Sequence, residues 1–284
     1  MADKLLLFDG NALVHRAYHA LPPFRSPDGT LVNAVYGFMS SLLAAIALHT
    51  PKYVVVAFDV AGKTFRNELY EQYKATRQKA DQALYDQIPI IQALLKNMNV
   101  PSFGVAGFEA DDVLATIAKQ AKGVDTIIVT GDNDALQLVG DHVTVYSVSR
   151  GDKLAVSYTT QGVVDRYGIP PERLADYKSL TGDPSDNVKG LVGIGPKRAT
   201  ELVRKYGTVE NMIKHLPELR QFKNDLLLAK KLVTLVDTVP LRLNLYKARL
   251  TDYDTKKMAR EFLRLGFKSL VKRLPESEQE KLFP

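Results

Sequence analysis

The chain has 284 residues and no cysteine, which allows one large or two ordinary domains and excludes disulfides and thiolate metal sites. No apolar run is long enough to span a membrane and the first ten residues do not form a secretory signal, so we expect no contact with a membrane. The formal net charge of +6 suits a polyanionic partner without identifying one.

Strand-like and helix-like segments alternate over the first 160 residues. Four short apolar runs predict buried strands: Lys4–Phe8, Tyr53–Phe58, Thr126–Thr130 and Val143–Val148. Apolar stripes with helical spacing predict helices within 35–46, 84–98 and 110–121, the second of them begun or kinked by Pro89. Strands that alternate with helices favour an α/β fold with a largely parallel central sheet flanked by helices.

Four aspartates stand where three of these strands end. Asp9 and Asp59 come directly after the first two apolar runs, and Asp132 and Asp134 follow the third in the sequence TGDND. Ligands of open α/β sheets bind at the carboxyl ends of the strands, so we expect these carboxylates at one edge. A lone aspartate at a strand end is usually a turn residue or a helix cap, but four that converge are poorly explained as caps.

The sequence GFEADD places Glu109, Asp111 and Asp112 at the start of the third predicted helix. On a helical wheel Glu109 and Asp112 lie close together and Asp111 lies on the other flank of the apolar stripe, so a shared ligand must sit at the end of the helix. Taken alone, acidic residues in a first turn simply favour the helix dipole. Together with the strand-end aspartates they would repel one another unless cations neutralise them, and ligands made only of oxygen indicate Mg²⁺ or Mn²⁺.

Short helices broken by glycine and proline begin near residue 160 and predict a mainly helical second domain. A predicted helix over Ala175–Thr181 is followed by the sequence GDPSDN, which contains Asp183 and Asp186. Taken alone, this sequence is an acidic turn. Beside seven other carboxylates, the two aspartates are expected to complete a metal site from the second domain.

The run GLVGIGPKRA, residues Gly190–Ala199, predicts a tight glycine turn that feeds a helix begun by Pro196 and ended by Gly207. Exposed backbone N–H groups at such a turn, beside Lys197 and Arg198, suit phosphate. An ordinary helix–helix turn is the simpler interpretation of the glycines alone.

Residues 62–82 combine cations with tyrosines. If Lys63–Lys79 is one helix, a single face carries Lys63, Arg66, Tyr70, Tyr73, Lys74 and Arg77. Such a face suits a single nucleic-acid strand through phosphate contacts and base stacking. A solvated amphipathic helix whose tyrosines cover the core explains the stretch about equally well.

Five stretches, in this order and spacing, resemble the 5′-nuclease (flap endonuclease) family, and within it the amino-terminal 5′→3′ exonuclease domains of bacterial DNA polymerase I. They are FDGNALVHRAYHAL, FDVAGKTFRNELYEQYKATR, GFEADDVLATIA, VTGDNDALQLV and YKSLTGDPSDNVKGLVGIGPKRATELV. Five ordered motifs are far more specific than any one of them. The resemblance implies an α/β nuclease domain over 1–160 with a helical clamp at about 62–85, and a helical duplex-binding domain over 161–284 with a helix-3-turn-helix unit at about 174–207.

The resemblance also implies roles for individual residues. Nine carboxylates would bind metal: Asp9, Asp59, Glu109, Asp111, Asp112, Asp132, Asp134, Asp183 and Asp186. Two clamp residues would be catalytic: Lys74 and Arg66. DNA would contact the clamp and the glycine hairpin: Lys63, Arg66, Tyr70, Tyr73, Lys74, Arg77, Lys189, Gly190, Gly193, Gly195, Lys197 and Arg198. The carbonyls of that hairpin could also hold K⁺.

Two residues depart from the family's pattern. Asn133 stands where the family commonly has lysine between the paired aspartates, which removes one cation near the metals. Lys189 stands where the family commonly has proline. The first departure bears on metal affinity or rate, and the second on the rigidity of the hairpin.

By this resemblance the chain is expected to hydrolyse DNA phosphodiesters near 5′ ends or at the base of 5′ flaps, in replication and repair. Two Mg²⁺ or Mn²⁺ ions would act at the scissile phosphate, and the products would carry 5′-phosphates. The resemblance implies a monomer in the bacterial cytoplasm, near the nucleoid, whose partner is DNA with 5′ ends, flaps or nicks and whose parent chain could include a polymerase domain. Two alternatives stay open: a non-catalytic DNA-binding module of the same fold, which loss of carboxylates would favour, and a related sheet-domain ribonuclease, which the hairpin argues against.

Overall fold

The computed structural model describes residues 2–78, 80–148, 154–250 and 253–275. Its strands are β1 (Lys4–Asp9), β2 (Tyr53–Ala57), β3 (Ser102–Phe103), β4 (Asp125–Thr130), β5 (Val143–Ser147), β6 (Val156–Tyr158), β7 (Gly182–Asp183) and β8 (Val188–Lys189). The first six form one sheet in the order β3-β2-β1-β4-β5-β6, in which all neighbours are parallel except β5 and β6. The predicted α/β fold with a largely parallel sheet is confirmed.

β1 lies at the centre of the sheet and is covered on both faces. Leu5 and Leu7 pack on one face and Leu6 and Phe8 on the other, and all four are fully buried. A strand buried on both faces gives a continuous apolar run, which is why β1 was recognisable in the sequence. All four predicted strands are confirmed to within one residue at each end. β3 and β6 were not predicted, because they are only two and three residues long.

The helices of the first part are α1 (Gly10–Ala20), α2 (Asn33–His49), α3 (Phe65–Leu69), α4 (Gln82–Tyr85), α5 (Ile88–Asn97), α6 (Ala110–Gln120) and the 3-10 helix η1 (Asp134–Leu138). α1, α2 and α5 pack on the face of the sheet that carries Leu6, and α6 packs on the face that carries Leu5. The helices predicted within 35–46 and 110–121 are confirmed, and the one predicted within 84–98 begins only at Ile88, because Leu84 belongs to α4. Pro89 lies in the first turn of α5, so it begins this helix and does not kink it.

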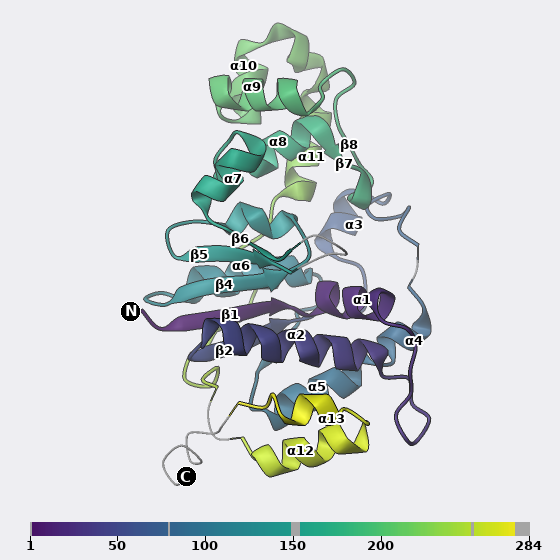
Figure 1. The fold of residues 1–284 in the computed structure, drawn as a ribbon. Coiled ribbons are helices and arrows are strands. Elements are labelled where there is room, and N and C mark those ends of the chain that lie inside the picture. Colours follow the sequence, from purple (N-terminus) through teal and green to yellow (C-terminus); the bar gives the residue numbers. More distant parts are fainter. Residues whose placement is uncertain (1, 79, 149–153, 251–252, 276–284) are drawn as a thin grey trace.

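The remaining helices are α7 (Thr160–Tyr167), η2 (Pro171–Arg173), α8 (Leu174–Thr181), η3 (Pro184–Asp186), α9 (Pro196–Tyr206), α10 (Val209–His215), η4 (Pro217–Phe222), α11 (Lys223–Val233), α12 (Thr255–Arg264) and α13 (Lys268–Val271). Figure 1 shows α7 to α11 stacked at one end of the molecule, beyond β5 and β6. As predicted, α9 begins at Pro196 and is ended by Gly207, whose φ of +75° suits glycine. None of the helices in the described ranges is both long and apolar enough to cross a membrane.

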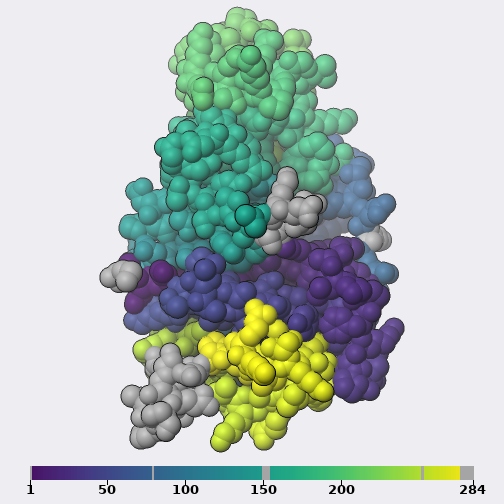
Figure 2. Space-filling view, viewed as in Figure 1, coloured from purple at the N-terminus to yellow at the C-terminus, as the bar shows by residue number. Residues whose placement is uncertain are grey.

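The last two helices, α12 and α13, return to the sheet. Met258, Phe262 and Leu270 are fully buried in the same core as α2 and α5. Figure 2 shows these helices, in yellow, against the blue surface of the amino-terminal part and remote from the green helical end. Within the expected domain of residues 161–284, the helices from residue 255 onward therefore lie with the sheet. Residues 276–284 lie outside the described part of the chain.

The helix predicted over Lys63–Lys79 is wrong. α3 has only five residues, Tyr70 ends it in an extended conformation, and turns follow. Lys74 has a left-handed backbone with φ +57°, which no right-handed helix allows. The cause is tertiary: Arg66 and Tyr73, which a continuous helix would place on one face with the exposed Lys63, are 1% and 4% exposed. Lys79 lies outside the described residues.

Candidate active site

Asp9, the last residue of β1, is buried at the carboxyl edge of the sheet. Its Oδ1 accepts a hydrogen bond from the backbone N–H of Ala12 at 3.0 Å, and its Oδ2 accepts one from the hydroxyl of Thr130 at 2.7 Å. Burial raises the pKa of Asp9 to about 7 against the effect of these two hydrogen bonds, and the nearby charges of Asp132 and Asp59 add to the rise. The parallel pairing of β1 with β2 and β4 brings these groups together.

The start of α6 is tied to the end of β2. Asp59 Oδ1 accepts a hydrogen bond from the backbone N–H of Ala110 at 2.7 Å, so this aspartate also helps to cap α6. Asp111, one residue further on, faces the strand-end aspartates. The pKa of Asp111 is raised well above its ordinary value by burial and then by repulsion from Asp9, Asp132 and Asp134.

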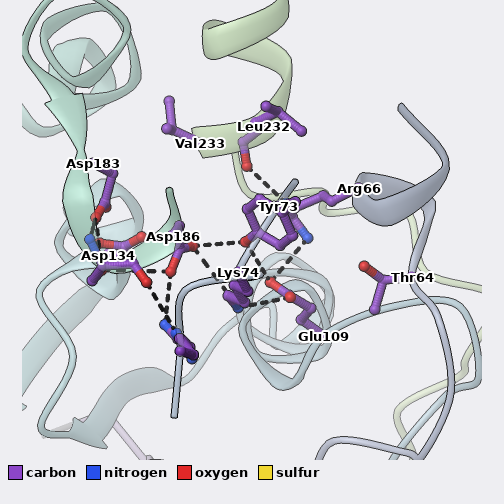
Figure 3. Close-up of polar contacts among 12 residues, drawn as sticks. Thr64, Arg66, Tyr73, Lys74, Glu109, Asp134, Asp183, Asp186, Leu232 and Val233 are labelled. Atoms are coloured by element: carbon purple, nitrogen blue, oxygen red, sulfur yellow. Dashed lines mark hydrogen bonds and ion pairs between the residues drawn. The ribbon is translucent and has the colours of Figure 1, made fainter. Parts of the chain in front are cut away.

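The GDPSDN turn brings two carboxylates from the helical part to the sheet. Asp134, Asp183 and Asp186 offer carboxylate oxygens that all lie within 4.8 Å of one another (Figure 3). The Nζ of Lys178, on α8, forms ion pairs with Asp134 and, at 2.7 Å, with Asp183 Oδ2. Burial and repulsion from Asp132 raise the pKa of Asp134 to about 6, although Lys178 acts in the opposite sense. Like charges from both parts of the chain therefore share this region.

The clamp approaches the carboxylates from another side, as Figure 3 shows. Lys74 Nζ lies 2.7 Å from Glu109 Oε1 and 3.8 Å from Asp186 Oδ2. The hydroxyl of Tyr73 donates to Asp186 Oδ2 at 2.7 Å and lies 3.1 Å from Glu109 Oε2. Arg77 pairs with Asp186 Oδ1 at 2.7 Å. Asp186 therefore joins the clamp to the GDPSDN turn, and the buried Tyr73 presents no ring face for base stacking.

Arg66 and Asp112 form a buried ion pair at the base of the clamp, with nitrogen–oxygen distances of 2.7 and 2.8 Å. Their side chains are 1% and 0% exposed. Of the other predicted clamp residues, Lys63 is exposed, and Tyr70 packs partly against a small core that contains Leu232. The structure thus pairs Arg66 with Asp112 and places Arg66 Nη1 3.3 Å from Glu109 Oε2.

The glycine hairpin projects between β8 and α9. Its exposed residues include Lys189, Val192, Gly193, Gly195, Lys197 and Arg198. Gly193 has φ +82°, a conformation that favours glycine. Gly190 instead lies against the end of α8, where an added Cβ would approach the backbone of Thr181 to 2.3 Å. The hairpin is therefore anchored by one glycine and bent by another, with cations beside it.

A cavity of about 1000 Å³ opens beside Asp132 and includes residues that were not predicted. Nitrogen-bearing side chains from α1, the clamp and α7 line it: His15, Arg16, His19, Arg77 and Arg166. A signal for part of this set exists in the sequence, because His15 and His19 are four residues apart on the helix that follows Asp9. Arg166 donates to Asn133 Oδ1 at 3.0 Å, so a cation does stand beside the position where the family commonly has lysine.

Two family models match the chain. The N-terminal resolvase-like domain of 5′-3′ exonucleases matches residues 4–168, and their C-terminal SAM fold matches residues 169–256. The chain is 37% identical to the 5′-3′ exonuclease of Aquifex aeolicus, over 98% of this chain and 96% of that protein. It is also 37% identical to DNA polymerase I of Bacillus caldotenax, over 99% of this chain and 34% of that protein. The chain thus spans about a third of the length of such polymerases.

Solved structures show the same fold at low identity. A flap endonuclease of bacteriophage T5, in a pseudo-enzyme–product complex with DNA and metal ions, matches with a TM-score of 0.68 and 21% identity, over 95% of this chain and 96% of that one. The catalytic core of Rad2 in complex with DNA substrate matches with a TM-score of 0.60 and 17% identity, over 97% and 93% of the two chains. With the family models and the Aquifex relative, these likenesses confirm the resemblance seen in the sequence: the chain belongs to the 5′-3′ exonuclease family.

Proposed function

We propose that this chain uses divalent cations to hydrolyse phosphodiester bonds of DNA near a 5′ end or at the base of a 5′ flap, leaving 5′-phosphates. The observation that carries the proposal is that carboxylate oxygens of Asp134, at the start of η1 beyond β4, lie within 4.8 Å of those of Asp183 and Asp186, from the helical part. Membership of the 5′-3′ exonuclease family supports it, as does the binding of DNA and metal ions by the T5 relative. Removal of primers or flaps in replication and repair is the corresponding cellular role.

The donor set fits Mg²⁺ or Mn²⁺, because it consists of carboxylate oxygens and the chain has no thiol. Burial, and then repulsion between neighbouring carboxylates, raises the pKa values of Asp9, Asp111 and Asp134, and bound cations would relieve both effects. We assign two ions, one to Asp134, Asp183 and Asp186 and the other to Asp9, Asp111 and Asp132, with Asp59 and Glu109 at the margin. Bound there, such ions would activate water and stabilise the departing oxygen.

The cations around this site would position the substrate. Lys74 lies among the carboxylates, where it can stabilise charge on the scissile phosphate. The cavity lined by His15, Arg16 and Arg166 can hold the phosphates of a single strand that ends there. The hairpin can grip the backbone of a duplex, with K⁺ on its carbonyls, so the substrate would be chosen by shape and not by base sequence.

Cleavage of an end-labelled 5′-flap DNA, with and without Mg²⁺, tests the proposal. We expect a cut at the flap base only with Mg²⁺, and almost none from Asp134→Asn, which removes an anionic ligand without changing shape. The same variant should bind the flap in a chelator at least as well as the parent, because a repelling charge is lost. Substantial cleavage by Asp134→Asn at physiological Mg²⁺ would contradict the assignment.

Two further outcomes separate the alternatives. If the parent binds flap DNA but cleaves nothing in Mg²⁺ or Mn²⁺, the chain is a DNA-binding module of the same fold. If a matched RNA flap is cleaved faster than the DNA flap, the chain is a ribonuclease.

A further inference from the structure

In the described part of the chain, Arg66 has the largest of the fully buried side chains. A guanidinium has five N–H donors, and each one here has an acceptor. Nε donates to the carbonyl of Leu232 at 2.8 Å, and Nη2 donates to the carbonyl of Thr234 at 2.9 Å and to Asp112 Oδ1 at 2.8 Å. Nη1 donates to Asp112 Oδ2 at 2.7 Å and to Glu109 Oε2 at 3.3 Å. All five donors are therefore committed within the protein, and a phosphate would have to displace one of these acceptors.

Asp112 is equally committed. Its Oδ1 accepts from Arg66 Nη2 and from the backbone N–H of Val236 at 2.9 Å. Its Oδ2 accepts from Arg66 Nη1 and from the backbone N–H of Glu109 at 3.1 Å. Each oxygen thus has two donors, which fill its lone pairs, and the side chain is fully buried. In contrast to Asp134, Asp183 and Asp186, this carboxylate has no free oxygen lone pair for a metal ion.

The pair joins three segments that are distant in the sequence. Arg66 lies on α3, at the base of the clamp, Asp112 lies in the first turn of α6, and residues 232–236 leave the end of α11. Glu109 connects this pair to Lys74, because its carboxylate accepts a hydrogen bond from Arg66 and another, at 2.7 Å, from Lys74. The end of α11 is therefore linked to the side chain of Lys74 through hydrogen bonds that are buried at Asp112 and partly buried at Glu109.

We propose that Arg66 and Asp112 are positioning residues, a buried joint through which the end of α11 sets the place of Glu109 and Lys74 at the carboxylate edge. Neither residue contacts metal or phosphate. The proposal rests on the proposed function only where Lys74 acts on the substrate. Replacing one partner leaves a buried charge unpaired, whereas replacing both with apolar side chains does not, so the fold of the double variant should be more stable than that of either single variant.

Cation binding tests the role of Asp112 without cleavage. Calorimetry with Ca²⁺ and electron paramagnetic resonance with Mn²⁺, on the full chain, should give Asp112→Asn the parent's number of ions with affinities within about threefold. Asp134→Asn should lose an ion or bind it at least about tenfold more weakly. Asp3→Asn is the control, since its ion pair with Lys52, at 2.6 Å, is exposed. If Asp112→Asn loses an ion as Asp134→Asn does, Asp112 is a metal ligand and the proposal fails.

Hydrogen exchange tests the joint itself. Arg66→Met and Asp112→Leu should each speed exchange over residues 70–78, where the backbone N–H of Lys74 is bonded to the carbonyl of Asp186 at 2.9 Å. The double variant also lacks the joint, so it should exchange as fast over these residues as the single variants do even where its fold is more stable. Arg66→Lys should be intermediate between the parent and Arg66→Met, because it keeps the charge but has fewer donors. If the parent and both single variants exchange at equal rates over these residues, the proposal that Arg66 and Asp112 form a joint is contradicted.

Substrate measurements separate positioning from contact. Each folded single variant should bind flap DNA in Ca²⁺ within about threefold of the parent, yet cleave at least about tenfold more slowly in single turnover. If Arg66→Met instead weakens binding and lowers its salt dependence by about one released ion, Arg66 contacts phosphate. If the single variants do not fold, the double variant is measured in their place. Loss of an ion or of DNA affinity in the double variant would contradict the proposal. Hydrogen exchange and ion binding are measured without cleavage. They can therefore support or contradict the joint even if the chain proves not to be a nuclease.

Discussion

Asp9 has a pKa of about 7 in the folded chain, against an ordinary value of 3.8. A carboxyl group whose pKa is raised by folding contributes stability that is fully present below pH 4 and is lost as the pH rises through about 7. In chelator, Asp9→Asn should therefore stabilise the chain at pH 8, by on the order of 4 kcal/mol, and by much less at pH 4.5. Thermal melts at both pH values measure this. Asp225→Asn, an exposed carboxyl, is the control, and an equal effect of Asp9→Asn at both pH values would contradict the linkage.

Lys74 is the clamp cation that forms ion pairs with both Glu109 and Asp186. As a cation beside the scissile phosphate it would stabilise charge that grows in the transition state, so Lys74→Ala should lower single-turnover cleavage by about 10²–10³-fold. Binding of flap DNA in Ca²⁺ should change much less, and Lys74→Arg should recover part of the rate. Lys122→Ala is the control, because Lys122 is an exposed lysine outside the clamp. If Lys74→Ala cleaves at the parent rate once saturated, Lys74 only binds substrate.

Residue types at strand ends were predictable, but the partners of each residue were not. Asp9 and Asp134 could be placed at one edge, because the apolar runs before them locate the ends of β1 and β4. Arg66 and Asp112 are 46 positions apart, and the sequence shows that both are charged but not that they are hydrogen-bonded to each other. Lys178 was missed for the same reason: its helix was predicted, but not that it faces Asp134.

At the level of elements, long periodic segments were predicted well and the clamp was not. α2, α5 and α6 each bury a long apolar stripe, so the helical spacing of their apolar residues was enough to predict them. In the clamp, the pattern of cations and tyrosines has a helical period, yet the backbone leaves the helix at Tyr70. Burial of Tyr73 and the ion pairs of Arg66 and Lys74 outweigh helix propensity there, and such contacts are invisible in a local window.

The glycine hairpin offers a matched pair of sites. An added Cβ would meet nothing within 4 Å at Gly193 or at Gly195, but the backbone φ is +82° at the first and −84° at the second. Gly193→Val should therefore distort the turn and weaken salt-sensitive duplex binding by about tenfold, while Gly195→Val should leave the turn intact. Fluorescence anisotropy with blunt duplex DNA measures this. Equal losses of duplex affinity in the two variants would indicate that the added side chains crowd the DNA. If neither variant loses affinity and circular dichroism confirms that both are folded, the hairpin has only a structural role.

At the level of the whole molecule, the last helices complete a core that begins at the first strand. Phe262 on α12 is fully buried with residues of α2 and α5, while its neighbour Leu263 is 51% exposed. Phe262→Ala should destabilise the chain by about 3–5 kcal/mol, and Leu263→Ala by less than about 0.5 kcal/mol. Urea unfolding measures both. Cation binding by Phe262→Ala, measured where it is folded, should match the parent, because the carboxylate edge lies elsewhere, and a small loss of stability would contradict the role given to α12.

The return of α12 and α13 to the sheet also bears on how the chain folds while it is being made. The core that holds Leu6, near the start, is closed by Leu270, near the end. When the first 160 residues have left the ribosome, the apolar stripes of α2 and α5 still lack their cover, and about 110 further residues must be added, which takes roughly 5–20 s. During that interval these apolar residues of the nascent chain stay exposed, so the core that contains Leu6 is completed only after α13 has been synthesised.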